Sequence, residues 1–273
     1  MQRALKPLIG SKIHARDGTI GHVRNLYLDD ARWVLRYLVV ETGGWLHGRT
    51  VLISPAAFES ANWDEHEVSL ALTRKQIEES PDVSTDLPIS RQHEIELHRY
   101  YQWPAYYVYG LGSSLGWPYP ELYVAPPGAE PSPASADIGD SHLESLRVLT
   151  GYELRAKDGA LGHLDDCVAD DDTWEVRWLV VDTHRWLPGR RVLISPRRVR
   201  DVNWSHSVIH VDLGRDDISG SPEFDPAVPA SHEYEDVVFD FYGRPKSWRR
   251  EGGRKADNGS ATPGVQAHTG EGG

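Results

Sequence analysis

The chain has 273 residues, of which 39% are hydrophobic and 26% charged, and its formal net charge is −12. These proportions are ordinary for a folded domain, and the negative charge argues against non-specific binding of DNA, RNA or anionic lipid, which requires a cationic surface. No apolar run approaches the roughly 20 residues of a transmembrane helix, and residues 1–7 lack the apolar stretch of a signal peptide. We therefore expect a cytoplasmic protein with no membrane span. A single cysteine, Cys167, leaves no partner for an intrachain disulfide.

An internal repeat organises the chain. Residues 42–55 reappear as residues 183–196, an offset of 141 that also matches Trp33 to Trp174 and continues without a gap to Pro104 and Pro245. Such self-similarity indicates two copies of one small domain. We expect the following division: a first unit with a trailing helix over 1–107, an aromatic and then Pro/Gly/Ser-rich linker over 108–140, a second unit with a trailing helix over 141–248, and a disordered tail over 249–273.

Within the first unit, residues 12–23 predict a β-hairpin with a tight turn at Asp17-Gly18, because this dipeptide tolerates positive φ angles. Gly21 inside the second strand predicts a bulge or a close approach of another backbone. A turn at residues 29–32 precedes a strand over 33–41, which is apolar on both faces near its end and is expected to be central.

Two more strands are expected over 49–53, where Ser54-Pro55 ends the strand, and over 67–72, where apolar residues alternate. Thr73 and Gln76 have the spacing of a capping box and predict a short helix that ends near residue 80. A further helix should begin at Ser90 and end before Pro104. Five short strands in series favour a meander that closes into a barrel.

The order of these features resembles the PRC-barrel domain. The resemblance rests on residues of the first unit and on a second set displaced by 141 positions: Gly10, Asp17, Gly18, Gly21, Asp29, Asp30, Trp33, 36–40 and 45–55. It implies a mainly β fold of two tandem, small, partly open β-barrels, each followed by short helices.

Related barrels occur in the H subunit of the bacterial photosynthetic reaction centre and in the ribosome maturation factor RimM, where they dock on protein surfaces. The resemblance thus implies a non-catalytic protein-binding or scaffold protein. Alternatives are an RNA-associated or ribosome-assembly factor and an H-subunit-like accessory that associates peripherally with a membrane complex; a hydrolase is the last choice. Fold analogy alone does not name the partner or the oligomeric state.

The sequence offers no convincing catalytic or cofactor set, and we expect neither an enzyme nor a cofactor. Asp170, Asp171 and Asp172 could supply oxygen ligands to Ca²⁺, but they lack the spacing of a calcium loop and Asp is a common turn residue. His22 and His163 recur after the same glycine without a recurring nucleophile, and Ser54 and Ser195 lack a nucleophile-elbow motif. The aromatic stretch over 100–123 is expected to pack on the barrels rather than to stack on a ligand.

One contrast between the copies points to a partner. The second copy gathers a set of arginines where the first has Arg49, Thr50, Ala56, Ala57 and Glu59: Arg190, Arg191, Arg197, Arg198 and Arg200. Guanidinium groups bind carboxylates with two parallel hydrogen bonds. These arginines are therefore candidates to dock an acidic partner, or the acidic first unit of a neighbouring chain.

Overall fold

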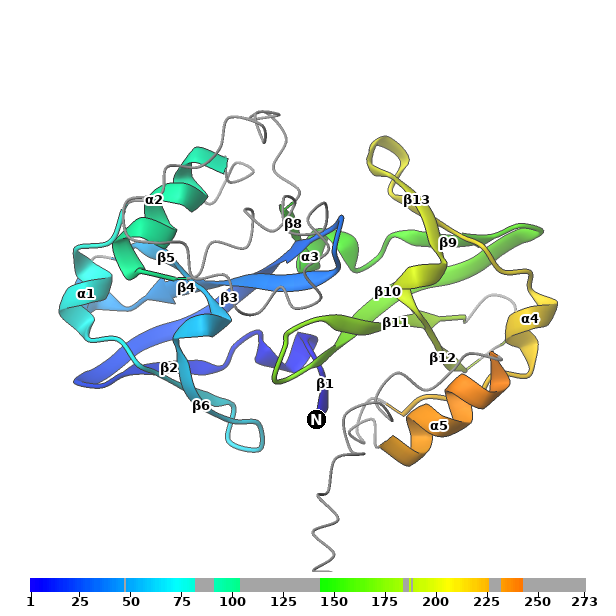
Figure 1. The fold of residues 1–273 in the computed structure, drawn as a ribbon, viewed down its shortest axis with the longest axis horizontal. Helices are drawn as coiled ribbons and strands as arrows, with labels where there is room; N and C mark the ends of the chain where they lie inside the picture. The colour runs from blue at the N-terminus through cyan, green and yellow to red at the C-terminus, as the bar shows by residue number, and fades with distance from the viewer. Residues whose placement is uncertain are drawn as a thin grey trace, which may run out of the picture.

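The fold is mainly β, as the sequence predicts. The computed structural model describes residues 1–46, 48–81, 91–103, 143–183, 187, 189–225 and 232–242. It contains two seven-stranded sheets, which lie side by side with helices at their outer ends (Figure 1). No helix in the described part of the chain is long and apolar enough to cross a membrane.

The first sheet carries the strands of the first copy. Its elements are η1 (Lys6–Leu8), β2 (Lys12–Ala15), β3 (Gly18–Asp29), β4 (Val34–Thr42), η2 (Gly44–Leu46), β5 (Thr50–Ile53), η3 (Pro55–Ala57), β6 (Phe58–Asn62), β7 (Glu67–Leu70), α1 (Arg74–Glu78) and α2 (Arg91–Tyr101). The strand order is β5-β4-β3-β2-β7-β6, with β2 and β7 parallel and the other neighbours antiparallel.

The second sheet repeats this arrangement. Its elements are α3 (Leu146–Leu149), β9 (Glu153–Ala156), β10 (Gly159–Asp170), β11 (Val176–Asp182), β12 (Arg191–Ile194), η8 (Pro196–Arg198), β13 (Val199–Asn203), η9 (Trp204–His206), β14 (Val208–Val211), α4 (Asp216–Ser219) and α5 (His232–Phe241). The strand order is β12-β11-β10-β9-β14-β13, so β4 and β11 occupy the same topological place, as a gapless repeat requires. Among the pairings of the described strands, none joins the two ends of either sheet into a closed barrel.

Each copy gives its first strand to the other copy. β1 (Gln2–Ala4) pairs antiparallel with β10, and β8 (Leu143–Ser145) pairs antiparallel with β3. The registers are equivalent, since Gln2 lies opposite Asp170 and Leu143 lies opposite Asp29. The seventh strand of each sheet is therefore contributed by the other copy.

The buried residues that follow the exchanged strands also hold the copies together. Leu5 and Leu146 are both 0% exposed, and both belong to one apolar core that includes buried residues from the two copies. Burying a leucine contributes roughly 1.5–3 kcal/mol. A smaller cluster lies beside α5 in the second copy and contains Trp178, Phe224 and Val238. The two copies thus share a core.

The predicted hairpin forms, but its turn lies one residue earlier than predicted. Ala15 pairs with Gly18, which leaves Arg16 and Asp17 in the loop, and Gly18 takes the positive φ of 145°. The Asp17 carboxylate instead accepts a hydrogen bond of 2.7 Å from the backbone N–H of Arg74 at the start of α1. Asp17 therefore serves both as a turn residue and as a hydrogen-bond acceptor for a helix that is distant in sequence.

Gly21 is required by a close backbone approach, as predicted. A Cβ built at Gly21 would lie 1.9 Å from the carbonyl oxygen of Glu41, and one built at Gly162 would lie 1.9 Å from that of Asp182. The capping box of α1 also forms, since Thr73 and Gln76 exchange side-chain to backbone hydrogen bonds. The strand β6 and its counterpart β13 were not predicted.

Candidate functional site

The candidate arginine surface surrounds η8 on the second copy. A serine-proline pair ends the preceding strand in both copies, and Pro55 and Pro196 each start a short 3-10 helix because proline lacks the N–H that a helix interior requires. The first copy continues with Ala56 and Ala57, and the second continues with Arg197 and Arg198. The same backbone therefore presents methyl groups in one copy and guanidinium groups in the other.

Arg197 and Arg198 are the two arginines of the set best placed to meet a partner. Arg197 is exposed, and its side chain has no hydrogen-bond or ion-pair partner among the described residues. Arg198 is partly exposed and lines a cavity of about 400 Å³ together with Lys157, Asp212, Asp216, Asp217, Leu213, Phe241 and Tyr242. A side chain that is already ordered beside a hollow loses less entropy on binding than one that is free in solvent.

Arg200 is engaged in a small exposed network. Its Nε lies 2.8 Å from Oδ2 of Asp201, and the imidazole of His210 lies 2.7 Å from the other carboxylate oxygen. The hydrogen bonds from Arg200 and His210 hold the pKa of Asp201 below its ordinary value. The charge of Arg200 is thus partly neutralised, although the guanidinium remains accessible.

Two arginines of the predicted set are bonded inside the fold. Arg190 donates to the carbonyl oxygens of Ser219 and Ser221, and Arg49 makes the equivalent bonds to the carbonyls of Glu78 and Ser80. This shared pairing gives Arg190 a structural role, and its signal was present in the sequence, where an arginine occupies the same position in both copies.

Arg191 pairs with Asp165, which also meets Lys6 of the first copy. Nε of Arg191 and Nζ of Lys6 lie 2.8 and 2.9 Å from the two carboxylate oxygens. Burial would raise the pKa of Asp165, but the hydrogen bonds from Lys6 and Arg191 outweigh it and hold this pKa below its ordinary value. The Lys6–Asp165 pair therefore links the two copies, whereas Arg191 bonds to the same carboxylate from within the second copy.

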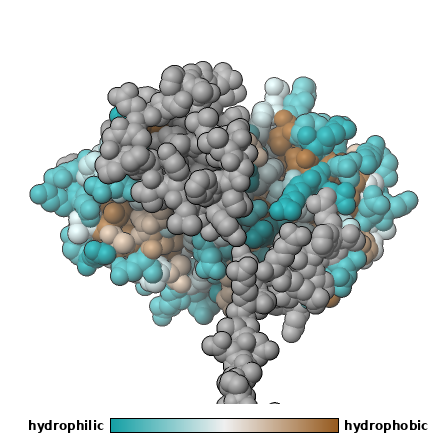
Figure 2. All heavy atoms as spheres, in the orientation of Figure 1, coloured by the Kyte–Doolittle hydropathy of each residue, from teal (hydrophilic) through white to brown (hydrophobic). Residues whose placement is uncertain are grey.

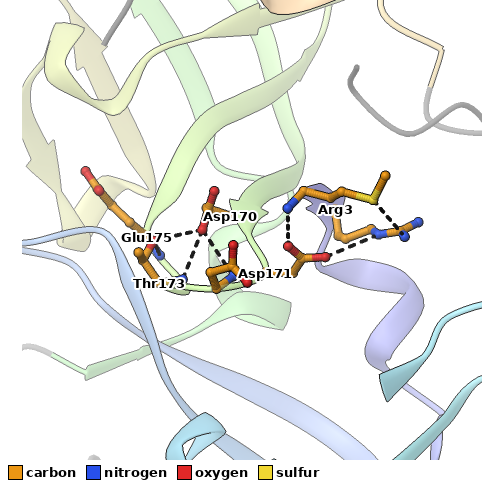
Figure 3. A network of polar contacts seen from close by, with 7 residues as sticks. Arg3, Asp170, Asp171, Thr173 and Glu175 are labelled. Atoms are coloured by element: carbon orange, nitrogen blue, oxygen red, sulfur yellow. Dashed lines mark hydrogen bonds and ion pairs between the residues drawn. The ribbon is translucent and has the colours of Figure 1, made fainter. Parts of the chain in front are cut away.

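Two of the three consecutive aspartates, Asp170 and Asp171, bind parts of the protein itself. Oδ1 of Asp170 accepts from the backbone N–H groups of Asp172 and Thr173, which closes the turn before β11. Asp171 contacts the amino group of Met1 and the guanidinium of Arg3, as Figure 3 shows. Within the described ranges, no group of three or more His, Cys, Asp or Glu side chains is placed to hold a metal ion.

The recurring histidines and serines do not converge. His22 is exposed and His163 half-buried, and they lie on the separate strands β3 and β10. The Ser54 hydroxyl accepts from the backbone N–H of Ala56, as expected of a turn residue. Of the aromatic stretch, Tyr101 and Trp103 stack with ring centroids 4.3 Å apart and Trp103 is buried, while Tyr106 and the aromatic residues beyond it lie outside the described residues.

The cavity beside Arg198 could not be predicted, because its walls come from three distant segments around Lys157, Asp212 and Phe241. The predicted linker over 108–140 and the predicted disordered tail over 249–273 lie outside the described residues. Neither the family models nor the curated proteins contain a match to this chain. Its function must therefore be argued from its own residues.

Proposed function

We propose that this chain is a non-catalytic protein-binding or scaffold protein, built from two copies of a PRC-barrel-like module and acting in the cytoplasm. Two repeated sheets of the same strand order support the tandem arrangement that the resemblance implies. The proposed binding surface consists of Arg197, Arg198 and Arg200, which we call the arginine surface. Its partner carries carboxylate groups.

One observation carries this proposal: the same 3-10 helix bears Ala56 and Ala57 in the first copy but Arg197 and Arg198 in the second. Long charged side chains cost conformational entropy when they are ordered. The fold does not require them at this position, because the first copy forms the same helix without them. A role outside the fold accounts for their presence on one copy.

An acidic protein is the partner that this surface fits best. Guanidinium groups favour carboxylates and phosphates. However, Asp201, Asp212, Asp216 and Asp217 lie around the arginines or line the neighbouring cavity. These carboxylates interrupt the continuous cationic path that an RNA backbone needs. The arginines can still make a small number of specific contacts with carboxylates of a partner protein.

A charge-reversal experiment tests the proposal. The variant Arg197→Glu with Arg198→Glu should lose the partner that the wild-type protein recovers in affinity purification, because rim charges control association. Its melting temperature should change by only a few degrees, since both side chains lie outside the core.

The matched control is Arg24→Glu with Lys75→Glu. It makes the same change in net charge at exposed positions of the first copy. This control should keep the partner. Equal recovery by wild type and the Arg197/Arg198 variant at low salt would rule out the arginine surface as the binding site.

A further inference from the structure

A second surface, which includes Glu59, the first-copy equivalent of Arg200 in the arginine surface, is acidic and aromatic instead of cationic. A groove of about 550 Å³ lies where the first copy meets the turn between β10 and β11. Beside Met1, whose amino group pairs with Asp171, its lining combines aromatic rings and carboxylates: Phe58, Trp63 and Trp174 with Glu59, Asp171 and Asp172. We refer to these six residues as the aromatic-acidic groove.

The aromatic wall is preformed. The rings of Trp63 and Trp174 stack across the two copies with centroids 6.4 Å apart, and Phe58 meets Trp174 edge-on at 5.1 Å. Trp63, Trp174 and Phe58 all pack against the shared core while remaining partly exposed. A ligand would find these rings already held in place, which lowers the entropy cost of binding.

The protein itself shows that this wall accepts a cation. The guanidinium carbon of Arg3 lies 5.4 Å from the centroid of the Trp63 ring, and Nε of Arg3 lies 3.7 Å from the Asp171 carboxylate. The same carboxylate pairs with the amino group of Met1, and Figure 3 shows its ion pair with Arg3. An aromatic face beside a carboxylate is the environment that guanidinium and ammonium groups prefer.

Two carboxylates of the groove remain available after these contacts. Asp172 is exposed, and its side chain has no partner among the described residues. Glu59 has a side chain that is 57% exposed, and the cation paired with it, Arg16, lies at the limit of an ion pair, 4.0 Å away. A second cation entering the groove would therefore meet one carboxylate with a long ion pair and, beside the amino group of Met1, one that makes no hydrogen bond or ion pair among the described residues.

The equivalent positions of the other copies differ at three of the six groove residues. The counterparts of Phe58 and Glu59 are Val199 and Arg200, and the counterpart of Asp172 is Ala31. Trp33, the counterpart of Trp174, is only 8% exposed. The fold therefore forms without Phe58, Glu59 and Asp172 at these positions, while Trp63, Trp174 and Asp171 keep the counterparts Trp204, Trp33 and Asp30.

We propose that the aromatic-acidic groove binds a cationic side chain, arginine or lysine, of a peptide segment in another protein. The carboxylates of the groove favour a cation, and the aromatic wall adds cation–π attraction. This site is separate from the arginine surface and does not depend on it.

Fluorine NMR of protein labelled with 5-fluorotryptophan tests this site with a defined probe. The probe is the blocked pentapeptide acetyl-Gly-Arg-Gly-Arg-Gly-amide, and Trp63→Phe and Trp174→Phe serve to assign the resonances. Saturable shifts are expected at Trp63 and Trp174, but not at Trp33 or Trp204. The shifts should weaken as salt is raised, because exposed charges are screened.

Two comparisons decide the role of charge. Glu59→Gln with Asp172→Asn should weaken binding about fivefold or more, as expected for two exposed ion pairs of about 0.5 kcal/mol each. The control variant Glu41→Gln with Glu96→Gln removes two exposed carboxylates elsewhere and should bind as wild type does. Equal shifts with the neutral citrulline peptide, or no shift at millimolar peptide, would overturn the proposal.

Self-association is a distinct outcome. Association at high concentration is measured for the wild-type protein and for both Glu59→Gln/Asp172→Asn and Arg197→Glu/Arg198→Glu. If the wild type associates and both variants abolish that association, the occupant of the groove is the arginine surface of a second copy. The proposal of a peptide from another protein is then wrong. Peptide binding that persists in Arg197→Glu/Arg198→Glu supports the groove independently of the arginine surface.

Discussion

Trp33 and Trp174 accept reciprocal backbone hydrogen bonds across the joint between the two copies. The carbonyl of Trp33 accepts from the N–H of Val176 at 2.7 Å, and the carbonyl of Trp174 accepts from the N–H of Leu35 at 2.9 Å. Both tryptophans have positive φ angles, 55° and 60°, which cost a non-glycine residue about 1–2 kcal/mol. The same unfavourable conformation occurs twice because the joint is symmetric and its hydrogen bonds and packing maintain it.

Replacing Gly21 should be severely destabilising. Gly21→Ala would place Cβ 1.9 Å from the Glu41 carbonyl oxygen, so β3 and β4 would have to separate at their tightest contact. We expect a loss of about 3 kcal/mol, the upper range for overpacking, measured by urea unfolding. Gly43→Ala is the control, because nothing lies within 4 Å of the new methyl group. Similar stabilities for the two variants would refute the close approach.

Asp166 should make the stability of the protein depend on pH. Burial raises the pKa of Asp166 to about 7 from 3.8, despite hydrogen bonds from the backbone N–H groups of Cys167 and Lys6. Between about pH 4 and 7 the folded protein holds a proton that the unfolded chain releases, so stability should fall as pH rises through this window. The neighbouring charges on Lys6 and Asp165 act in opposite directions on this pKa.

The variant Asp166→Asn removes this titration. Asn25, the equivalent residue of the first copy, accepts from the backbone N–H groups of Leu26 and Arg147 without ionising. Asp166→Asn should therefore flatten the pH profile and raise the free energy of unfolding at pH 8, by ~4 kcal/mol at most for a three-unit shift. Chemical denaturation at pH 5 and pH 8 measures the difference. A variant less stable than wild type at pH 8 would contradict the assigned pKa direction.

Arg190 and Arg197 should respond differently to truncation. Arg190→Ala leaves the carbonyls of Ser219 and Ser221 without their donor and should cost about 1–3 kcal/mol, as should Arg49→Ala in the first copy. Arg197→Ala should change stability by less than about 0.5 kcal/mol. Thermal unfolding of the three variants separates the structural arginines from the proposed binding one. A large loss in Arg197→Ala would show that it serves the fold.

The repeat made most of one copy predictable. The capping box at Thr73 and the close approach at Gly21 depend on local chemistry that a short stretch of sequence displays. The hairpin turn was misplaced by one residue, since the Asp17 carboxylate bonds to Arg74, which is distant in sequence. Patterns among neighbouring residues could not predict the contact between Asp17 and Arg74.

The sequence could not predict that each copy gives its first strand to the sheet of the other copy. β1 and β8 have three residues each, too few for an alternating pattern to be recognised. The repeated leucines, Leu5 and Leu146, were a signal of burial, but they could not say which sheet buries them. For the arginine surface, the sequence identified the contrast between the copies, and the arginine shared by positions 49 and 190 was a sequence signal that Arg190 serves the fold, which its contacts show.

Hydrogen exchange measured by mass spectrometry tests the interlocked pairing of the two copies most directly. In a variant lacking residues 1–4, the segment 168–171 should exchange faster than in wild type, because β1 pairs with this part of β10 and the Asp171 N–H donates to the carbonyl of Met1. The Asp170 N–H should stay protected, since it donates to the carbonyl of Glu175. The amides of residues 27–29, which pair with β8, should keep more of their protection. Unchanged exchange at 168–171, with new exposure confined to the first copy, would contradict the strand exchange.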